Sequence, residues 1–350
     1  MPCRVIEAET RKVRAGPVGR ELSRLPRPVE STREGKSDSM TSAAWWRDFE
    51  YANGVLHVRK TGVDVPVGAG VAMEAASWLA FHACVEATRL AVRADGPKLW
   101  FALDRPRPWY LLWPVMQLAG IRIVARREDA ECIFIFDDRT HTHIDGSLQA
   151  GSALNGGCLN VSKSKVVAVF EAVFDRPLSV DPQTWDGAMV AKSELNGVHD
   201  GRVLTGPRAA EAGQVYQRLI ETAGADGCVE DLRCPTVGGR IPLVFIKRRP
   251  VERRFENTNS SVTLAAPSAV FTQTELDQLS AFCREMKLDW GGLDVLRDRK
   301  SGALYVVDVN KTDMGPPIAL PMKDKMRAVR TLAAALRAFL EERREASLPE

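Results

Sequence analysis

The chain has 350 residues, of which 45% are hydrophobic and 27% charged, and its formal net charge at pH 7 is +3. This composition is typical of a globular protein with two or three packed units, and so small a basic excess does not indicate a nucleic-acid partner. The longest apolar run is too short to cross a bilayer, no apolar signal segment opens the chain, and the seven cysteines lack CxxC spacing. We therefore expect a cytoplasmic protein with reduced thiols, no membrane partner and no nucleic acid.

The first 150 residues divide into a tail and a small unit. Residues 1–45 are rich in Arg, Glu, Pro and Ser without a sustained hydrophobic period, which predicts a disordered N-terminal tail. In residues 46–150, strand-like apolar runs alternate with helical patterns, which predicts a Rossmann-like α/β unit. The predicted strands are 54–58, 98–103, 121–124 and 132–136, and the predicted helices are 71–92 and 109–118, the second of them broken or started near Pro114. No GxGxxG is present, so we assign no dinucleotide to this unit.

A polar loop, residues 137–151, follows the last predicted strand of that unit. In open α/β sheets, ligands bind at the carboxyl ends of strands. His141 and His143 have a spacing that can hold a transition metal, although polar loop residues in water have the same composition. We favour the second interpretation for the histidines and expect this loop to contact a substrate.

Residues 151–345 are predicted to form the second unit, with a first lobe at 151–215 and a second lobe at 216–345. The first lobe is predicted to hold a helix at 166–174 with Ser162 as N-cap, a strand at 188–193, a glycine-containing loop at 194–201 and a strand at 202–204. The second lobe is predicted to hold an apolar segment at 215–220, a strand from 230 with a turn at 237–240, a return strand at 241–247, and helices at 272–286 and 322–342.

Lys192 lies on the strand that precedes the glycine-containing loop. An ammonium beside such a loop is typical of phosphate binding, because backbone N–H groups and a point charge both attract phosphate oxygens. An edge-strand lysine that deters aggregation, next to an ordinary hairpin turn, explains the same residues equally well. The arginines that follow the return strand are open to two interpretations as well, as solvated surface or as contacts to an anionic substrate: Arg248, Arg249, Arg253 and Arg254.

A hairpin within residues 290–317 carries the most informative pattern. Two β-prone runs flank the turn residues 298–302, and symmetric pairing about Ser301 would place Asp294 opposite Asp308. Asn310 would share the face of Asp308, because side chains alternate along a strand.

Two carboxylates brought so close repel each other unless a cation neutralises them. Oxygen ligands suit Mg²⁺ or Mn²⁺. The alternative is a surface hairpin bounded by acidic residues, but Asp308 lies within an apolar run, where a lone carboxylate is costly.

The order of these parts, over about residues 155–342, resembles that of ATP-grasp enzymes, and most closely the branch of ribosomal-protein glutamate ligases and glutathione synthetases. The resemblance implies an α/β fold in which two subdomains clamp ATP. It rests on Lys165 and Lys192, the loop 197–201, the segment 215–220, the Asp231–Arg233 and Val237–Gly239 pattern, and the hairpin carboxylates. It implies nucleotide contacts for Lys165, Lys192, Gly197, Gly201, Gln217, Arg218, Leu219 and Arg233, catalytic roles for Lys192 and Arg249, and metal binding by Asp294, Asp308 and Asn310.

The chain departs from the family pattern at three points. Asp308 stands where the family has Glu, one methylene longer, so a bridge between two metal ions is in doubt and a single ion is compatible. Lys163 fits the first lysine as well as Lys165 does. Asn257 and Asn259 are alternative matches for the family's asparagine.

The resemblance implies an ADP-forming ligase that uses ATP with Mg²⁺ or Mn²⁺. A substrate carboxylate would attack the γ-phosphate, and an amine or thiol would then displace phosphate from the acyl phosphate. The partners would be a small carboxylate and an amine, or a protein or peptide acceptor, and the sequence is compatible with a homodimer. The alternatives are a phosphotransferase on a small hydroxyl substrate and a non-catalytic ATP-binding module.

Overall fold

The computed structural model describes residues 45–59, 63–145, 148, 152–198, 200–256 and 258–346. The predicted tail, residues 1–45, lies outside this part of the chain apart from its last residue. The described chain opens with a 3₁₀ turn and a three-stranded antiparallel sheet, β1 (Phe49–Ala52), β2 (Val55–Val58) and β3 (Val63–Pro66), followed by α1 (Ala69–Arg89). Strands β1 and β2 turn at Asn53-Gly54, both with positive φ, a hairpin signal that the sequence analysis missed.

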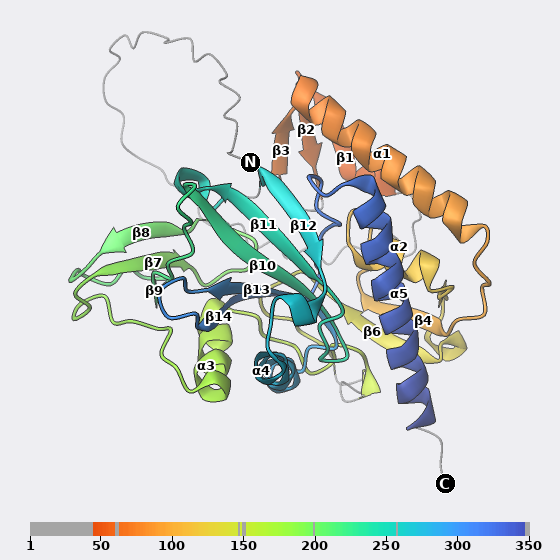
Figure 1. Cartoon of the computed structure of the whole chain (residues 1–350). Coiled ribbons are helices and arrows are strands. Elements are labelled where there is room, and N and C mark those ends of the chain that lie inside the picture. The colour runs from red at the N-terminus through yellow and green to blue at the C-terminus, as the bar shows by residue number, and fades with distance from the viewer. Residues whose placement is uncertain are drawn as a thin grey trace.

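A parallel sheet follows in the order β5-β4-β6, as expected for an α/β unit (Figure 1). Its strands are β4 (Lys98–Leu103), β5 (Arg122–Ile123) and β6 (Cys132–Phe136), with α2 (Leu112–Leu118) between the first two. Strands 98–103 and 132–136 match their predicted bounds. Helix α2 begins at Leu112, close to Pro114, where a start was one of the predicted alternatives. Residues 109–111 are held by another segment instead: Leu111 N donates to Asp313 O (2.8 Å) and Gly315 N to Trp109 O (3.1 Å).

The next part of the chain pairs a helix with a small antiparallel sheet. Helix α3 (Lys163–Phe174) starts three residues earlier than predicted, and Ser162 caps it as expected, its hydroxyl accepting from Lys165 N. The sheet has the order β8-β7-β9 and comprises β7 (Ala188–Ser193), β8 (Arg202–Thr205) and β9 (Gln214–Arg218).

The largest sheet is antiparallel, in the order β12-β11-β10-β13-β14. Its strands are β10 (Cys228–Val237), β11 (Val244–Pro250), β12 (Ser261–Ala265), β13 (Trp290–Arg297) and β14 (Leu304–Asn310), with α4 (Gln273–Glu285) and α5 (Met322–Glu345) beside it. Strand β11 starts three residues later than predicted, so Arg248 and Arg249 lie within it rather than after it. The mixed α/β class is therefore confirmed.

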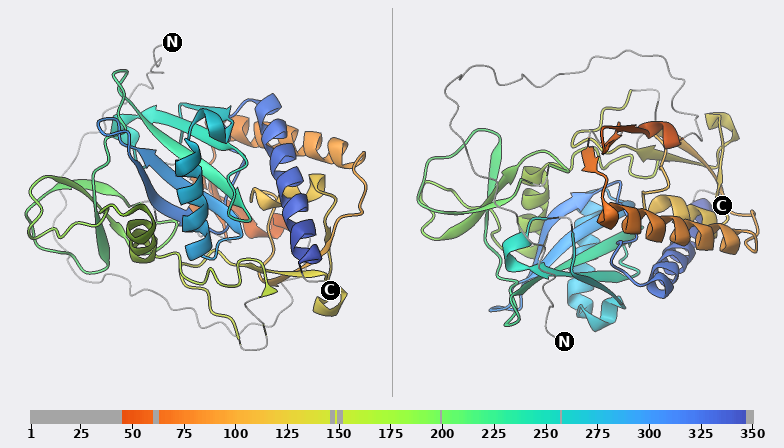
Figure 2. Two further views of the ribbon diagram at one scale, coloured as in Figure 1. Left: turned by 60° about the horizontal axis from the view of Figure 1, so that its bottom comes forward. Right: turned by 90° about the horizontal axis from the view of Figure 1, so that it is seen from above.

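Two hydrophobic clusters hold these layers together. One joins α1, α2 and the parallel sheet to α5 and to Trp290 at the start of β13, and the other lies under α3 and α4. Helix α5 runs beside α1 and α2 (Figures 1 and 2), although it belongs to the second predicted unit. The core thus crosses the predicted boundary at residue 150. No helix among the described residues is both long and apolar enough to cross a bilayer.

The β13–β14 hairpin contains a bulge that decides which side chains face the site. Asp294 pairs with Asp308, as predicted, but Val295 pairs with Val306, so Val307 is an extra residue in β14. Without it, the register of the turn-proximal pairs would place Val307 opposite Asp294 and turn Asp308 to the other face. The predicted pairing is confirmed, and the bulge, rather than symmetry about Ser301, produces it.

Gly291 in β13 cannot carry a side chain. A Cβ there would lie 2.5 Å from Asn310 O, a backbone atom of the paired strand, and 3.0 Å from Leu288 Cδ1. We expect Gly291→Ala to lower the free energy of unfolding by about 1–3 kcal/mol, measured by urea denaturation. Gly70→Ala, in α1 with nothing within 4 Å of the added Cβ, is the control. It is expected to be neutral or stabilising, and equal losses in both variants would contradict the steric argument.

Candidate functional site

A cavity of about 920 Å³ lies between the β7–β9 sheet, the large sheet, α1 and the loop after β14. Ten of the residues assigned by the resemblance line it: Lys192, Gly197, Gly201, Gln217, Arg218, Leu219, Arg233, Asp294, Asp308 and Asn310. Lys165 and Arg249 do not. The antiparallel pairing of β10, β13 and β14 places Arg233, Asp294 and Asp308 side by side on the cavity floor.

The lysine of α3 that reaches the cavity is Lys163, not Lys165. Lys163 is the first helical residue, is only 5% exposed, and its Nζ lies 2.5 Å from Asp308 Oδ1. Lys165, two positions further round the helix, is exposed and does not line the cavity. Of the two alternative lysines, Lys163 is therefore the one that lines the cavity and pairs with β14.

Lys192 projects from β7 toward the bulge in β14. Its Nζ donates to Val307 O at 2.8 Å, the carbonyl of the extra residue. Burial lowers the pKa of Lys192 to about 8, although the nearby Asp308 carboxylate works in the opposite direction. The first lobe and the hairpin thus meet through this lysine.

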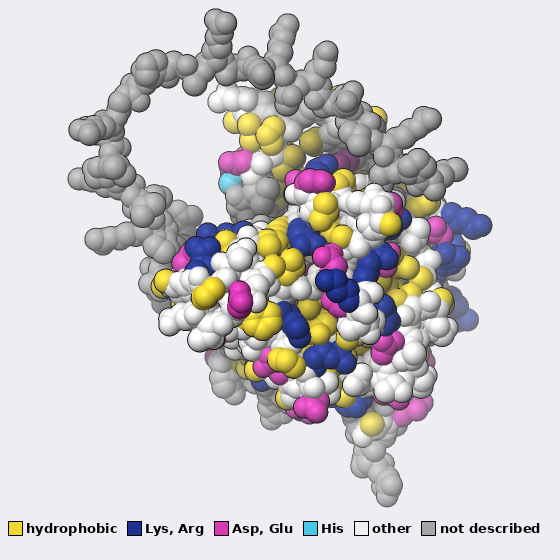
Figure 3. Space-filling model, turned by 60° about the vertical axis from the view of Figure 1, so that its left-hand side comes forward, with side chains coloured by type: hydrophobic (Ala, Val, Ile, Leu, Met, Phe, Trp, Pro, Cys, Tyr) yellow, Lys and Arg dark blue, Asp and Glu magenta, His cyan; other side chains and the backbone are white. Residues whose placement is uncertain are grey.

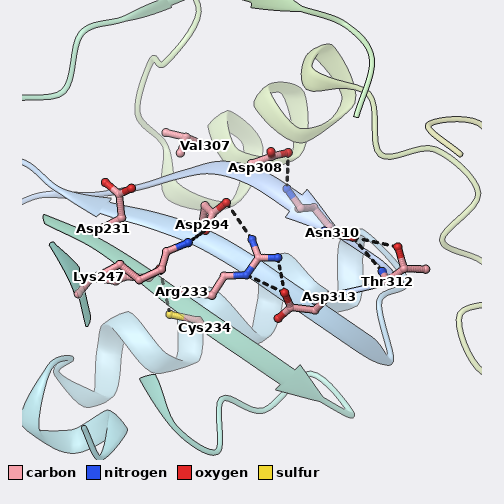
Figure 4. A network of polar contacts seen from close by, with 12 residues as sticks. Asp231, Arg233, Cys234, Lys247, Asp294, Val307, Asp308, Asn310, Thr312 and Asp313 are labelled. Atoms are coloured by element: carbon pink, nitrogen blue, oxygen red, sulfur yellow. Dashed lines mark hydrogen bonds and ion pairs between the residues drawn. The ribbon is translucent and has the colours of Figure 1, made fainter. Parts of the chain in front are cut away.

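A chain of ion pairs crosses the cavity floor, with Arg233 between Asp294 and Asp313 (Figure 4). Arg233 Nη1 lies 2.8 Å from Asp294 Oδ2, and its Nη2 lies 2.5 Å from Asp313 Oδ1. Lys247 Nζ lies 3.7 Å from Asp294 Oδ1. Burial disfavours the charged forms of Asp294 and Arg233, but their neighbours of opposite charge together have the larger effect. The pKa of Asp294 is therefore lowered and the pKa of Arg233 is raised.

Asp313 and Lys247 are functional candidates that the sequence analysis missed. Asp313 is 3% exposed, and a Cβ at Gly292 would lie 2.5 Å from its Oδ2, so the glycine makes room for this carboxylate. The run of residues after Asn310 carried no pattern that marked Asp313. Lys247 was visible only as the last residue of a predicted strand.

The oxygen ligands fit a hard divalent cation. Asp294 Oδ1 is buried without a hydrogen-bond partner, and Asp308 lies opposite it. Mg²⁺ takes one or two carboxylates from a protein and completes its shell with water and phosphate. Among the residues that the structure describes, no group of three or more His, Cys, Asp or Glu side chains could hold a metal by itself. Two carboxylates would leave the remaining positions of such an ion to water or to the oxygens of a ligand.

Arg249 lies behind the cavity wall instead of on it. It is 5% exposed, pairs with Asp231, and its Nη1 donates to Glu256 O (2.6 Å) and Asn259 Oδ1 (3.3 Å). Burial lowers its pKa. Asp231 and Asn259 both line the cavity, so Arg249 positions two wall residues. Asn257, the alternative match for the family's asparagine, lies outside the described residues.

The other arginines of this region divide between two interpretations. Arg248 pairs with Asp226, and Arg253 with Glu256, which favours surface ion pairs over contacts to an anionic substrate. Arg254 lines the cavity. On the side of the molecule that carries β7–β9, basic and acidic side chains are interspersed (Figure 3).

The end of the cavity toward α1 is largely apolar. Trp78 and Trp109 face the loop after β14, where Met314 and Ile318 are 57% and 51% exposed. Backbone hydrogen bonds between residues 109–111 and 313–315 fix this end. The loop 137–151 was expected to contact substrate, but none of its described residues lines the cavity. The carboxylate of Asp137 instead forms an ion pair with Arg139, and the backbone of His141 forms an isolated antiparallel β-bridge with Asn160.

Comparison with known proteins gives matches among solved structures only, since no family model and no curated protein matches. The ATP-grasp ligase PsnB with a minimal precursor is 13% identical, with 70% of this chain and 99% of that chain covered and a TM-score of 0.46. A RimK-domain ATP-grasp protein from Sphaerobacter thermophilus is 13% identical, with 70% and 99% covered and a TM-score of 0.42. D-alanine–D-alanine ligase from Bacillus anthracis, with ATP, is 10% identical, with 72% and 100% covered and a TM-score of 0.41.

Proposed function

We propose that this chain is an ATP-dependent ligase that activates a carboxylate as an acyl phosphate and joins it to an amine, or to a thiol. The observation that carries the proposal is the convergence in one cavity of two lysines from the first lobe and two carboxylates from one hairpin. The cavity also has a glycine-containing loop on one wall and an apolar end on the other.

The charges on the cavity floor suit a polyphosphate. Lys163, Lys192, Arg233 and Lys247 gather around Asp294, Asp308 and Asp313, so cationic side chains lie beside the carboxylates that would hold a metal ion. Preorganised charges of this kind stabilise a transferring phosphoryl group without reorganising during the reaction. A Mg²⁺ ion held by Asp294 and Asp308 would add neutralising charge at the phosphates.

The reaction proceeds in two steps. A substrate carboxylate oxygen attacks the γ-phosphorus, the bond to the β–γ bridging oxygen breaks, and ADP leaves. The nitrogen lone pair of the amine then attacks the acyl carbon, the bond from that carbon to the phosphate oxygen breaks, and the proton lost by nitrogen ends on the released phosphate. The chain positions the reactants, and the loop that contains Gly197 and Gly201 excludes water from the acyl phosphate.

The apolar end beside Trp78, Trp109, Met314 and Ile318 provides room for the acceptor or for the remainder of the carboxylate substrate. Apolar walls favour apolar substituents there, because burying them releases water.

The test is release of ADP and phosphate from Mg²⁺·ATP across a panel of carboxylates and amines, with mass spectrometry of the products. A new amide or thioester mass with free phosphate is expected. A phosphorylated acceptor would instead identify a phosphotransferase, and nucleotide binding without turnover on any panel member would favour a non-catalytic module.

The pKa of Lys192 predicts a pH dependence. The side-chain amine of Lys192 must be protonated to attract phosphate, and burial lowers its pKa to about 8. We expect kcat/KM for ATP to fall as the pH rises through about 8, because that ratio reports the free enzyme. Lys192→Arg, whose guanidinium stays charged, is expected to remove this decline while lowering the plateau. The same decline in both proteins would assign the titration to another group.

A further inference from the structure

We propose that the cavity holds a single divalent cation beside the nucleotide, because Lys163 takes the place that a second ion would need. The inference rests on the proposed ATP-dependent function, but it concerns the number of ions, which that function leaves open. The number of ions is limited by how many carboxylate oxygens of Asp294 and Asp308 remain free to bind a metal.

Asp308 has only one free carboxylate oxygen. Its Oδ1 accepts from Lys163 Nζ (2.5 Å) and from Val309 N (2.8 Å), which uses both lone-pair positions of that atom. A carboxylate that bridges two ions with both of its oxygens gives one oxygen to each ion. Asp308 has Oδ2 alone for a metal, so this two-oxygen bridge is closed to it.

Asp294 is limited in the same way. Its Oδ2 is held by Arg233 Nη1 at 2.8 Å, whereas its Oδ1 is buried without a hydrogen-bond partner and lies 3.7 Å from Lys247 Nζ, beyond hydrogen-bond distance. Each carboxylate thus offers one oxygen, and two such oxygens with water and phosphate complete the shell of one Mg²⁺.

The carboxamide of Asn310 is engaged elsewhere. Its Oδ1 accepts from Thr312 N (2.9 Å) and from Thr312 Oγ1 (3.3 Å), contacts that shape the loop after β14. The third ligand implied by the resemblance is therefore a loop-stabilising residue here, and no neutral oxygen is left for a second ion from this motif.

Lys163 cannot withdraw easily from Asp308. It is 5% exposed at the start of α3, where Ser162 caps the helix, so the helix holds its ammonium on the cavity floor beside Asp308. A buried charge without a partner is costly, and an ion at Oδ1 would face the ammonium at contact distance. The lysine thus supplies the charge that a second ion would bring.

The experiment titrates the protein with Mn²⁺ in the presence of saturating adenylyl imidodiphosphate. The electron paramagnetic resonance signal measures free Mn²⁺, and the difference from the total gives the number of ions bound per protein. We expect one ion per bound nucleotide in the unmodified protein. Lys163→Met keeps the length of the side chain, removes the charge and frees Asp308 Oδ1, so we expect two ions per nucleotide. Lys165→Met, the same change at an exposed position of the same helix, is the control and is expected to bind one.

Two ions in the unmodified protein would overturn the inference of a single ion and would leave the proposed function standing. One ion in both the unmodified protein and the Lys163→Met variant would overturn the role assigned to Lys163. If that variant fails to fold, the count in the unmodified protein still decides. No binding of the nucleotide analogue to the unmodified protein would overturn the proposed function together with this inference.

Discussion

Lys192→Met is expected to lower kcat for carboxylate-dependent ADP formation by about 100- to 1,000-fold, the loss typical of one preorganised electrostatic contact in a closed site. Lys192 reaches from β7 to the carbonyl of Val307, so its ammonium lies where β7 meets the β13–β14 hairpin. Methionine keeps the bulk of the side chain but removes the charge that, in the proposed mechanism, would neutralise the transferring phosphoryl group. Steady-state kinetics with saturating ATP would measure the effect.

The control for this variant is Lys300→Met in the exposed turn of the hairpin. It makes the same chemical change outside the cavity and is expected to keep the kcat of the unmodified protein. Thermal unfolding of both variants would separate lost catalysis from lost stability. Near-normal turnover in a folded Lys192→Met protein would contradict the assignment of Lys192 to the phosphoryl group.

Asp308→Asn is expected to raise the Mg²⁺ concentration that gives half-maximal activity and to lower kcat by about 100-fold or more. The substitution keeps the shape of the side chain, and the amide oxygen can still accept from Lys163. It replaces the one free carboxylate oxygen of Asp308 by a neutral group, so the anionic ligand is lost. A Mg²⁺ titration of ATP turnover measures both quantities.

Asp298→Asn provides the matched control on the same hairpin. The Asp298 carboxylate accepts from the backbone N–H groups of Lys300 and Ser301 and so stabilises the turn, away from the cavity. We expect this variant to unfold more readily, while its Mg²⁺ dependence stays that of the unmodified protein. An unchanged Mg²⁺ dependence in Asp308→Asn would exclude Asp308 as a metal ligand.

Local patterns were sufficient where a segment determines its own structure. The bounds of the strands 98–103, 132–136 and 188–193 and the N-cap at Ser162 follow from apolar runs and from capping chemistry. Ends that depend on a distant partner stayed open in the sequence. The start of α2 was one of these, because residues 109–111 pair with the loop after β14, 202 positions later in the case of Leu111 and Asp313.

For the site, the sequence by itself determined that Asp294 and Asp308 lie on the two strands of one hairpin and that Lys192 lies on the strand before a glycine-containing loop. Both follow from the order of short segments along the chain, whereas the regular register of the hairpin would place Val307 opposite Asp294. Tertiary structure alone decided which lysine of α3 turns inward, that Val307 bulges to aim Asp308, and that Asp313 closes the ion-pair chain. These features depend on ion pairs and packing contacts between segments that are distant in the sequence. Such contacts contribute free energy only when the fold brings the segments together.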